Sequence, residues 1–277
     1  MNRYRVEKRQ QLAHFLQEKI GGSIKGIRRS LEQNCCKING RIERFGSTWL
    51  QPGTVVEYFV PQEAVTSWTI LFENEDFQIV DKPVNWVCSE QNCERTFSRK
   101  LFLVHRLDKD TTGAMILAKN IAVRDELMTL FSSRSIEKEY LAVVDGVISQ
   151  DEGTIDNYLA KKGSFQGQTI WGSSTRGDHA ITHWKVQTRG TSETLVLCQP
   201  YTGRTHQIRV HMAEMGHPLI IDRQYASHFR SRIHANRPLL HAAKLSFMYR
   251  SQQIDVNCSP PKDFLKICTE HGLWRKS

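Results

Sequence analysis

The chain has 277 residues, 39% of them hydrophobic and 24% charged, and 38 Lys and Arg against 29 Asp and Glu give a net charge of +9. This length has room for about two domains of ~150 residues each. No apolar run approaches the ~20 residues of a membrane-spanning helix, and the N-terminus lacks the apolar stretch of a secretory signal, so neither a membrane protein nor a secreted one is expected. The basic excess favours nucleic acid over a membrane surface as the partner.

Seven cysteines are scattered along the chain, an odd number in a protein large enough to fold without disulfide bonds. They are expected to be reduced thiols, which predicts a cytoplasmic protein. Cys88 and Cys93 are too far apart for a C-x-x-C zinc knuckle, and no second pair accompanies them, so they predict no metal site.

The positive charge is concentrated at the start of the chain. Residues 1–60 hold 11 basic and 5 acidic residues, so 11 − 5 = +6, which leaves +3 for residues 61–277. A short basic segment beside a nearly balanced larger one indicates a binding module joined to a domain that does chemistry. Because the segment 61–67 is polar and contains proline, we predict a module over 1–60, a linker over 61–67 and a larger domain over 68–277.

The first predicted elements are two short helices. Over residues 7–20 the apolar side chains recur with helical spacing, and Gly21-Gly22 ends the pattern. Ser23 can cap a second helix that runs to about Asn34. A strong turn signal at Asn39-Gly40 then predicts a hairpin, and residues 54–60 read as a closing strand.

This basic segment resembles the small αL RNA-binding module of a ribosomal small-subunit protein, which also has two short helices followed by strands. The resemblance covers roughly residues 8–60. It implies that RNA is bound by basic side chains near the second helix and the hairpin: Arg28, Arg29, Lys37 and Arg41. The alternative is that Arg28 and Arg29 only form a solvated helix face, as most exposed arginines do.

In the larger domain, strands alternate with a few helices. Strands are predicted over 68–72, 77–80, 101–104, 113–118, 140–144, 181–187 and 194–199, and Asn120 can cap a helix to about Ser133. Runs of strands with few helices predict an α+β fold with a largely antiparallel sheet.

The segment 101–119 is the first candidate for chemistry. The four apolar residues 101–104 form a predicted strand, and His105-Arg106-Leu107-Asp108 follow at its end. A loop held by a strand is a common place for catalytic side chains. The basic neighbours of Asp108 favour its ionised form. On composition alone, the simpler interpretation is a polar loop whose charges neutralise one another.

The segment 199–225 is the second candidate. Gly203 and Thr205 can open a helix whose first turn presents Arg204 and His206, and helix N-termini bind phosphate through free N–H groups. A metal site is the alternative, because His206, His211 and His217 fall within twelve residues. Their spacings of five and six differ from the i, i+4 pair of a helical zinc site, so a metal site is not expected.

Three motifs in the larger domain resemble those of RluA-type RNA pseudouridine synthases. They are H-R-L-D followed by T-x-G at 105–113, K-x-Y-x-A-x-V-x-G at 138–146, and G-R-T-H-Q-I-R-V-H with G-H-P and D-x-x-Y at 203–225. Weaker matches extend the resemblance from about residue 70 to residue 268. The chain departs from the family at Thr112, where Ser is usual, and in a short and atypical loop over 82–104.

The resemblance implies a role for each matched residue. Asp108 is the catalytic carboxylate, Tyr140 stacks on the target base, and Arg209 pairs with Asp108. Further RNA contacts are implied for Arg106, His105, Arg204, His206 and Gln207.

The implied reaction isomerises uridine to pseudouridine in structured RNA by cleaving the N1–C1′ bond and re-attaching the base through C5. It needs no metal, nucleotide or organic cofactor, and the base must be flipped out of its stack. Ribosomal RNA of the large subunit is favoured over tRNA as the partner, and a monomer is expected. The rivals are an inactive RNA-binding or ribosome-assembly factor with this fold, and a hydrolase built on Asp108 with His105 or His206.

Overall fold

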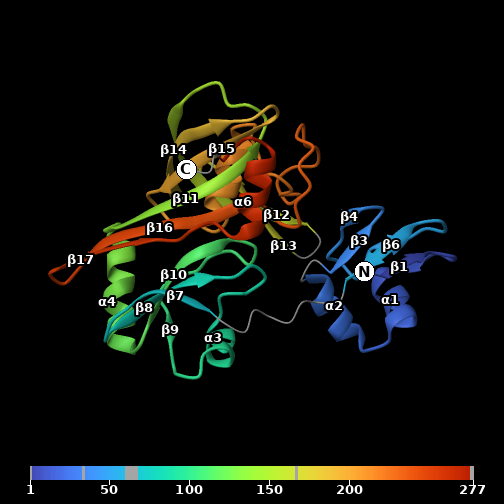
Figure 1. Cartoon of the computed structure of the whole chain (residues 1–277), viewed down its shortest axis with the longest axis horizontal. Helices are drawn as coiled ribbons and strands as arrows, with labels where there is room; N and C mark the ends of the chain where they lie inside the picture. The colour runs from blue at the N-terminus through green and yellow to red at the C-terminus, as the bar shows by residue number, and fades with distance from the viewer. Residues whose placement is uncertain (1, 33–34, 60–67, 166–167, 275–277) are drawn as a thin grey trace. The chain divides into compact units, whose positions relative to one another are not determined.

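The computed structural model describes residues 2–32, 35–59, 68–165 and 168–274. The chain divides into two compact units, Met1–Thr66 and Ser67–Ser277 (Figure 1). The predicted linker over 61–67 lies outside the described residues.

The small unit contains both predicted helices. Its elements are α1 (Leu12–Ile20), α2 (Ile24–Glu32), a four-stranded antiparallel sheet in the order β1 (Asn2–Arg5), β6 (Val55–Tyr58), β3 (Cys36–Ile38) and β4 (Arg41–Ile42), and a pair formed by β2 (Gln10–Gln11) and β5 (Trp49–Leu50). The first helix begins at Leu12 rather than residue 7, because residues 10–11 pair with β5 instead.

The predicted end of the first helix and the predicted start of the second are confirmed. Gly21 has φ +74°, a conformation that ends a helix and suits glycine. The Ser23 hydroxyl then accepts a 3.0 Å hydrogen bond from the Gly26 N–H and caps α2. Asn39 and Gly40 both have positive φ, as the predicted two-residue hairpin turn requires.

The large unit is built on an eleven-stranded sheet. Its main path runs β13 (Gln168–Ser173), β12 (Glu152–Phe165), β14 (Asp178–Arg189), β15 (Glu193–Pro200), β11 (Ile136–Asp145), β16 (Leu240–Tyr249), β10 (Thr112–Ala118), β8 (Phe77–Lys82) and β7 (Thr69–Glu73), with β17 (Gln252–Asn257) beside β16 and β9 (Phe102–Leu103) beside β10. Its strand pairs are antiparallel except for β10 with β16, which confirms the predicted α+β class.

Helices pack on both faces of this sheet (Figure 1). They are α3 (Glu90–Thr96), α4 (Ile121–Ser132), α5 (Gln207–Glu214) and α6 (Lys262–Glu270). Successive residues of a strand point to opposite faces, so Leu141 and Val143 pack with α6 while Ala142 and Val144 pack with α5. Tyr140 lies on the α5 face. No helix among the described residues has the length and apolar character needed to cross a membrane.

Several features of the large unit differ from the sequence prediction. The helix α5 begins at Gln207, so Arg204 and His206 lie in the turn before it rather than in its first turn. The long hairpin of β12 and β13 was missed, because its strands are rich in glycine, lysine and exposed polar residues. The short helices α3 and α6 were missed as well.

Gly113 sits where the chain leaves the Asp108 loop and pairs with Ala242 of β16. Its φ is +114°, and a Cβ atom placed there would lie 2.2 Å from the Ala242 carbonyl oxygen. That contact is with backbone, which no side-chain rotation relieves.

We expect Gly113→Ala to lower the free energy of unfolding by about 2–4 kcal/mol, from overpacking together with backbone strain. Urea denaturation measures this change. Gly163→Ala is the control, because Gly163 has no other atom within 4 Å of the added Cβ and no positive φ. Equal losses in the two variants would contradict the steric explanation.

Candidate active site

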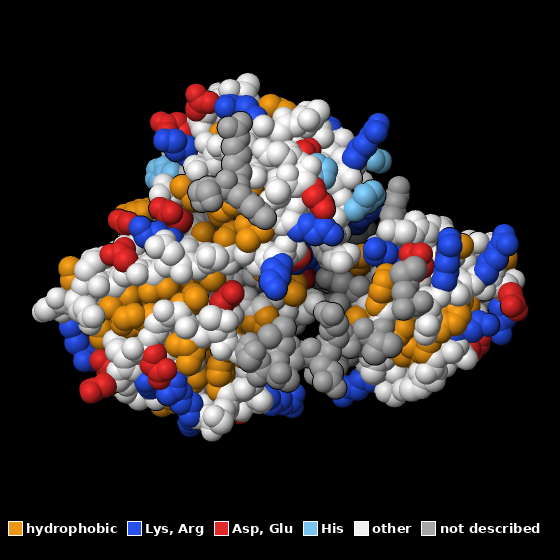
Figure 2. Space-filling view, in the orientation of Figure 1, with side chains coloured by type: hydrophobic (Ala, Val, Ile, Leu, Met, Phe, Trp, Pro, Cys, Tyr) orange, Lys and Arg blue, Asp and Glu red, His pale blue; other side chains and the backbone are white. Residues whose placement is uncertain are grey.

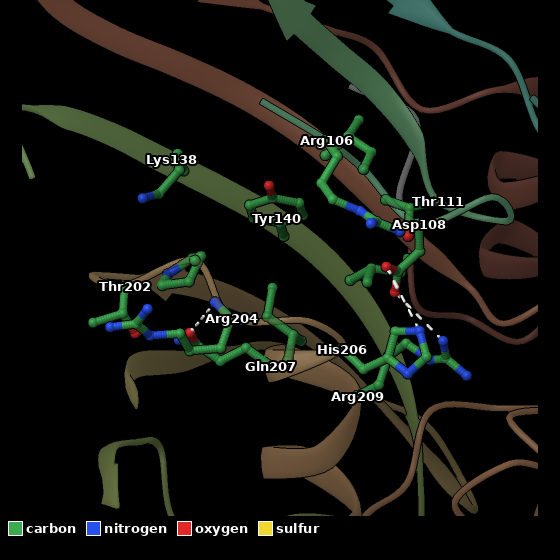
Figure 3. Close-up of a pocket in the computed structure, with 15 residues that line it drawn as sticks. Arg106, Asp108, Thr111, Lys138, Tyr140, Thr202, Arg204, His206, Gln207 and Arg209 are labelled. Atoms are coloured by element: carbon green, nitrogen blue, oxygen red, sulfur yellow. Dashed lines mark hydrogen bonds and ion pairs between the residues drawn. The ribbon is translucent and has the colours of Figure 1, made fainter. Parts of the chain in front are cut away.

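A cavity of about 90 Å³ opens on the α5 face of the large sheet. Its lining includes Asp108, Tyr140 and Arg209, the three residues predicted as catalytic (Figure 3). They come from three separate segments: the loop before β10, the strand β11 and the helix α5. The fold therefore brings together side chains that are up to 101 residues apart in sequence.

The Asp108 loop is held firmly at its far end. All seven residues of β10 are buried, and its pairing between β16 and β8 fixes where the loop returns. Within the loop, the Thr111 N–H donates to the Asp108 carbonyl at 3.1 Å and closes a tight turn. The Asp108 side chain stays 19% exposed, in contact with the cavity.

Two side chains face the Asp108 carboxylate. Arg209 Nη1 lies 3.4 Å from Oδ2, and His206 Nε2 lies 3.8 Å from Oδ1 (Figure 3). The predicted contact between Asp108 and Arg209 is thus present, although 3.4 Å is long for a charge-assisted hydrogen bond.

The stronger partner of Arg209 is a second carboxylate. Asp222 accepts from Arg209 Nε at 2.6 Å and from Nη2 at 2.8 Å, and Gln224 accepts from Nη2 at 2.7 Å. Burial disfavours the guanidinium charge, but the attraction of Asp222 and Asp108 outweighs it and raises the pKa of Arg209. Asp222 therefore fixes the guanidinium and leaves Nη1 directed at Asp108.

The sequence reasoning missed Asp222. In the sequence, Asp222 is the acid of the D-x-x-Y motif, which supports the family resemblance without indicating a role for this residue. Tyr225, the other end of that motif, lies with its ring 5.1 Å from the Arg209 guanidinium and so covers it.

His206 takes a left-handed conformation, with φ +57°, immediately before α5. Its Nδ1 lies 2.7 Å from the Tyr225 hydroxyl. Burial lowers the pKa of His206 despite the opposing attraction of Asp108, so the imidazole is neutral at neutral pH. Arg209 is therefore the charged group that faces the Asp108 carboxylate, and His206 is a neutral one.

Tyr140 forms a wall of the cavity between these groups and the start of β11. Burial, with a contribution from the Asp108 charge, raises the pKa of its hydroxyl, so the phenol keeps its proton. A neutral aromatic ring at a cavity wall is a stacking surface for a planar base.

Gln207 lines the cavity, but its side chain is engaged with the protein. Its amide oxygen accepts from the Thr202 hydroxyl and the Arg204 N–H, at 2.7 and 2.9 Å. Its amide nitrogen donates to the Ile181 carbonyl and the Thr182 hydroxyl. Gln207 therefore holds the turn before α5 in place.

Two arginines lie at the cavity, and they differ in how far the protein holds their side chains. Arg204 donates through Nε to the His179 carbonyl at 3.0 Å, and its Nη1 lies 3.8 Å from Asp178. Arg106 lines the cavity as an exposed side chain. Their predicted roles as RNA contacts are compatible with these positions and stay predictions.

His105 is not among the residues that line the cavity, and its predicted RNA contact stays a prediction. Its ring stacks on Phe131 at 4.5 Å, and its Nε2 accepts the Ile116 N–H at 3.0 Å. Burial and the nearby Lys138 charge lower the pKa of His105 to about 3, so the ring is neutral. It serves to tie the Asp108 loop to β10.

The three histidines considered for a metal site have separate partners. His206 contacts Tyr225, His211 contacts Thr182 and Asn157, and His217 contacts the Asp145 carbonyl. Across the part of the chain that the structure describes, no three His, Cys, Asp or Glu side chains gather as metal ligands would.

In the small unit, Lys and Arg side chains project from the face seen in Figure 2. Arg28 is exposed on α2, and Lys37 Nζ lies 5.5 Å from the Phe59 ring. The side chains of Arg29 and Arg41 lie outside the described residues. The RNA contacts predicted for these four residues stay predictions.

Comparison with known proteins adds an independent line of argument. Residues 76–214 match a family model described as RNA pseudouridylate synthase. Ribosomal large subunit pseudouridine synthase C of Buchnera aphidicola subsp. Baizongia pistaciae is 32% identical over 212 residues, which cover 71% of this chain and 67% of that protein. Ribosomal large subunit pseudouridine synthase D of Haemophilus ducreyi is 31% identical over 274 residues, with 86% of this chain and 83% of that protein covered.

The fold is shared as well. The solved structure of Human RNA Pseudouridylate Synthase Domain Containing 1 matches with a TM-score of 0.63 and 27% identity, over 73% of this chain and 86% of that one. The family model, the relatives and the fold agree, and the chain belongs to the RluA-type family of RNA pseudouridine synthases.

Proposed function

We propose that this protein converts specific uridines of large-subunit ribosomal RNA to pseudouridine, as a monomer in the cytoplasm, with Asp108 as the catalytic carboxylate. The observation that carries the proposal is the placement of Asp108 in a cavity with Arg209 at 3.4 Å and with Tyr140 in its wall. The names of the relatives, which act on the large ribosomal subunit, support the choice of RNA.

The chemistry is an isomerisation. The N1–C1′ bond breaks, a C5–C1′ bond forms, one proton leaves C5 and one is gained at N1, so no oxidant or reductant is consumed. A stacked uridine is out of reach of a carboxylate, so the nucleotide must be flipped into the cavity. Stacking on an aromatic ring such as Tyr140 is worth about 1–3 kcal/mol for a flipped base.

Asp108 can then act at the sugar, at the base ring or on a ribose proton, and each route needs an ionised carboxylate close to the nucleoside. Arg209 orients that carboxylate, and Asp222 keeps Arg209 in place. The neutral phenol of Tyr140 lies against the base without adding a competing charge.

Mapping pseudouridines in total RNA from cells with and without the gene tests the proposal. We expect one or a few sites in large-subunit ribosomal RNA to disappear without the gene and to return with the wild-type protein. Loss of sites in tRNA alone would contradict the RNA assignment. Altered ribosome assembly with an unchanged pseudouridine map would instead support the inactive assembly factor.

We also propose that the small unit is an αL-type module that supplies RNA affinity. Reversal of Arg28 and Arg29 to Glu should weaken RNA binding and flatten its salt dependence, because each phosphate neutralised adds about 0.7–0.9 to the slope of log K against log salt. At saturating RNA the conversion rate should stay near normal, since Asp108, Tyr140 and Arg209 belong to the other unit.

A matched control makes the same charge change elsewhere in the small unit. Arg3 and Lys8 already face carboxylates, with Arg3 at 3.9 Å from Glu57 and Lys8 at 3.6 Å from Glu18. Their reversal to Glu should therefore have the smaller effect on the slope. Equal effects of the two pairs would point to overall charge rather than a binding face, and a collapse of the saturated rate would show that the module also positions the uridine.

A further inference from the structure

Lys138 is a buried cation in the wall of the catalytic cavity. It lies on β11 two residues before Tyr140, so both side chains point to the same face of the sheet, with their Cα atoms about 7 Å apart. Only 9% of Lys138 is exposed. Figure 3 shows it on the opposite side of Tyr140 from Asp108.

The ammonium group has no acidic partner among the described side chains. Its Nζ lies 5.8 Å from the centroid of the Phe131 ring. Two other cations at the cavity differ, because Arg209 faces Asp222 at 2.6 Å and Arg204 faces Asp178 at 3.8 Å. Lys138 therefore brings a positive charge to the cavity that this part of the protein leaves without a carboxylate.

A buried charge without a counter-charge is unfavourable, and the titration of Lys138 reflects this. Burial lowers the pKa of its ammonium to about 8, with no acidic group acting in the other direction. An anion that entered the cavity would remove this penalty and hold the proton on the lysine. The RNA strand brings such an anion with every nucleotide.

We propose that Lys138 binds a backbone phosphate next to the flipped uridine and thereby fixes the nucleotide over Tyr140. This inference rests on the proposed function and names a contact for its substrate. A phosphate is a better partner than a base carbonyl, because only the phosphate neutralises the ammonium. Phosphate contacts fix where a nucleic-acid strand lies along a protein. The contact with Lys138 would do so next to the reacting base.

Lys138 is expected to change its charge between pH 7 and 9, a range in which most of the titratable groups around it do not change theirs. His105, from the Asp108 loop, has a pKa of about 3, and Cys198 on β15 has a pKa of about 12. Burial, with the Asp108 charge, raises the pKa of Tyr140 above its ordinary value of 10.0. Lys82, behind the Asp108 loop, also has a pKa of about 8, so the test must separate the two lysines.

The test measures binding of ribosomal RNA from cells that lack the gene, in an Asp108→Asn background that prevents turnover. Above pH 8 the free ammonium loses its proton, so affinity should fall by up to tenfold per pH unit, while below pH 8 it should be constant. Lys138→Arg should keep affinity flat to pH 9, because arginine stays charged. Lys138→Met should bind about tenfold or more weakly at pH 7, the loss of one charge-assisted hydrogen bond.

The salt dependence identifies the partner. At pH 7, Lys138→Met should reduce the slope of log K against log salt by about 0.7–0.9, the value for one phosphate. Lys266→Met is the control, because Lys266 is 74% exposed on α6 and faces Glu270. Urea midpoints of all variants confirm that they are folded.

Three results would overturn the proposal. An alkaline loss of affinity that persists in Lys138→Arg would assign the titration to another group such as Lys82. A weaker Lys138→Met variant with an unchanged slope would place a neutral base edge, not a phosphate, at the ammonium. Unchanged affinity in Lys138→Met would leave Lys138 a purely structural residue. Failure of the proposed function would appear separately, as wild-type protein that forms no pseudouridine in the same RNA.

Discussion

Asp108→Asn is expected to abolish pseudouridine formation, with a loss on the order of 10⁴-fold in single-turnover rate, while RNA affinity changes by no more than a few-fold. The substitution is nearly isosteric, so the cavity keeps its shape, but it removes the ionised carboxylate that faces Arg209. Affinity should persist because most protein–nucleic acid contacts are made to the backbone. The rate is measured with purified protein in excess over ribosomal RNA from cells that lack the gene.

Asp125→Asn provides the matched control. Asp125 lies on α4, and its side chain is 59% exposed beside Arg124, so its loss should leave both rate and affinity unchanged. Turnover retained in Asp108→Asn would remove Asp108 from the chemistry. A joint loss of turnover and of RNA binding would point instead to a damaged site.

Asp222→Ala should give the largest loss of stability. Arg209 is 11% exposed and Asp222 only 1%, and removal of one partner of a buried ion pair typically costs about 3–5 kcal/mol. The freed guanidinium can also turn away from Asp108, so the single-turnover rate at saturating RNA should fall under conditions where the variant is folded. Urea denaturation and rate measurements on the same preparation separate the two effects.

Asp263→Ala tests the same kind of pair with one exposed partner. Arg237 is buried like Arg209 and lies 2.9 Å from Asp263, but the Asp263 side chain is 53% exposed. Water can replace that carboxylate, and Arg237 keeps three backbone carbonyls as acceptors, so the loss should be clearly smaller and the rate unchanged. If the two variants lost equal stability, burial of the acid would not be the reason for the effect.

The local parts of the fold were predictable because their signals are local. The glycines after α1, the capping serine of α2 and Asn120, which accepts the Val123 N–H, each act within four residues of themselves. The apolar strands of the central sheet were predictable for the same reason. The β12–β13 hairpin was not, since its polar strands are stabilised by pairing with β14 rather than by an apolar pattern of their own.

The candidate site was predictable only in part. The motifs pointed to Asp108, Tyr140 and Arg209, and the structure brings them to one cavity. Spacing could not show that Arg209 is held mainly by Asp222, because a side-chain pair 13 residues apart depends on how the chain folds back after α5. Nor could it show that His105 turns into the interior, since a loop sequence does not tell which side chain faces the cavity.

The parallel pairing of β10 with β16 has a consequence for how the site is formed during synthesis. Thr112 lies beside His241, a partner 129 residues later, and their side chains join in a 2.9 Å hydrogen bond. The end of the Asp108 loop is thus held by β16, a strand that leaves the ribosome long after the loop does. Contacts of such long sequence separation form slowly. A nascent chain that ends before β16 is therefore expected to hold the loop in a non-native state, so that activity begins only once that strand has joined the sheet.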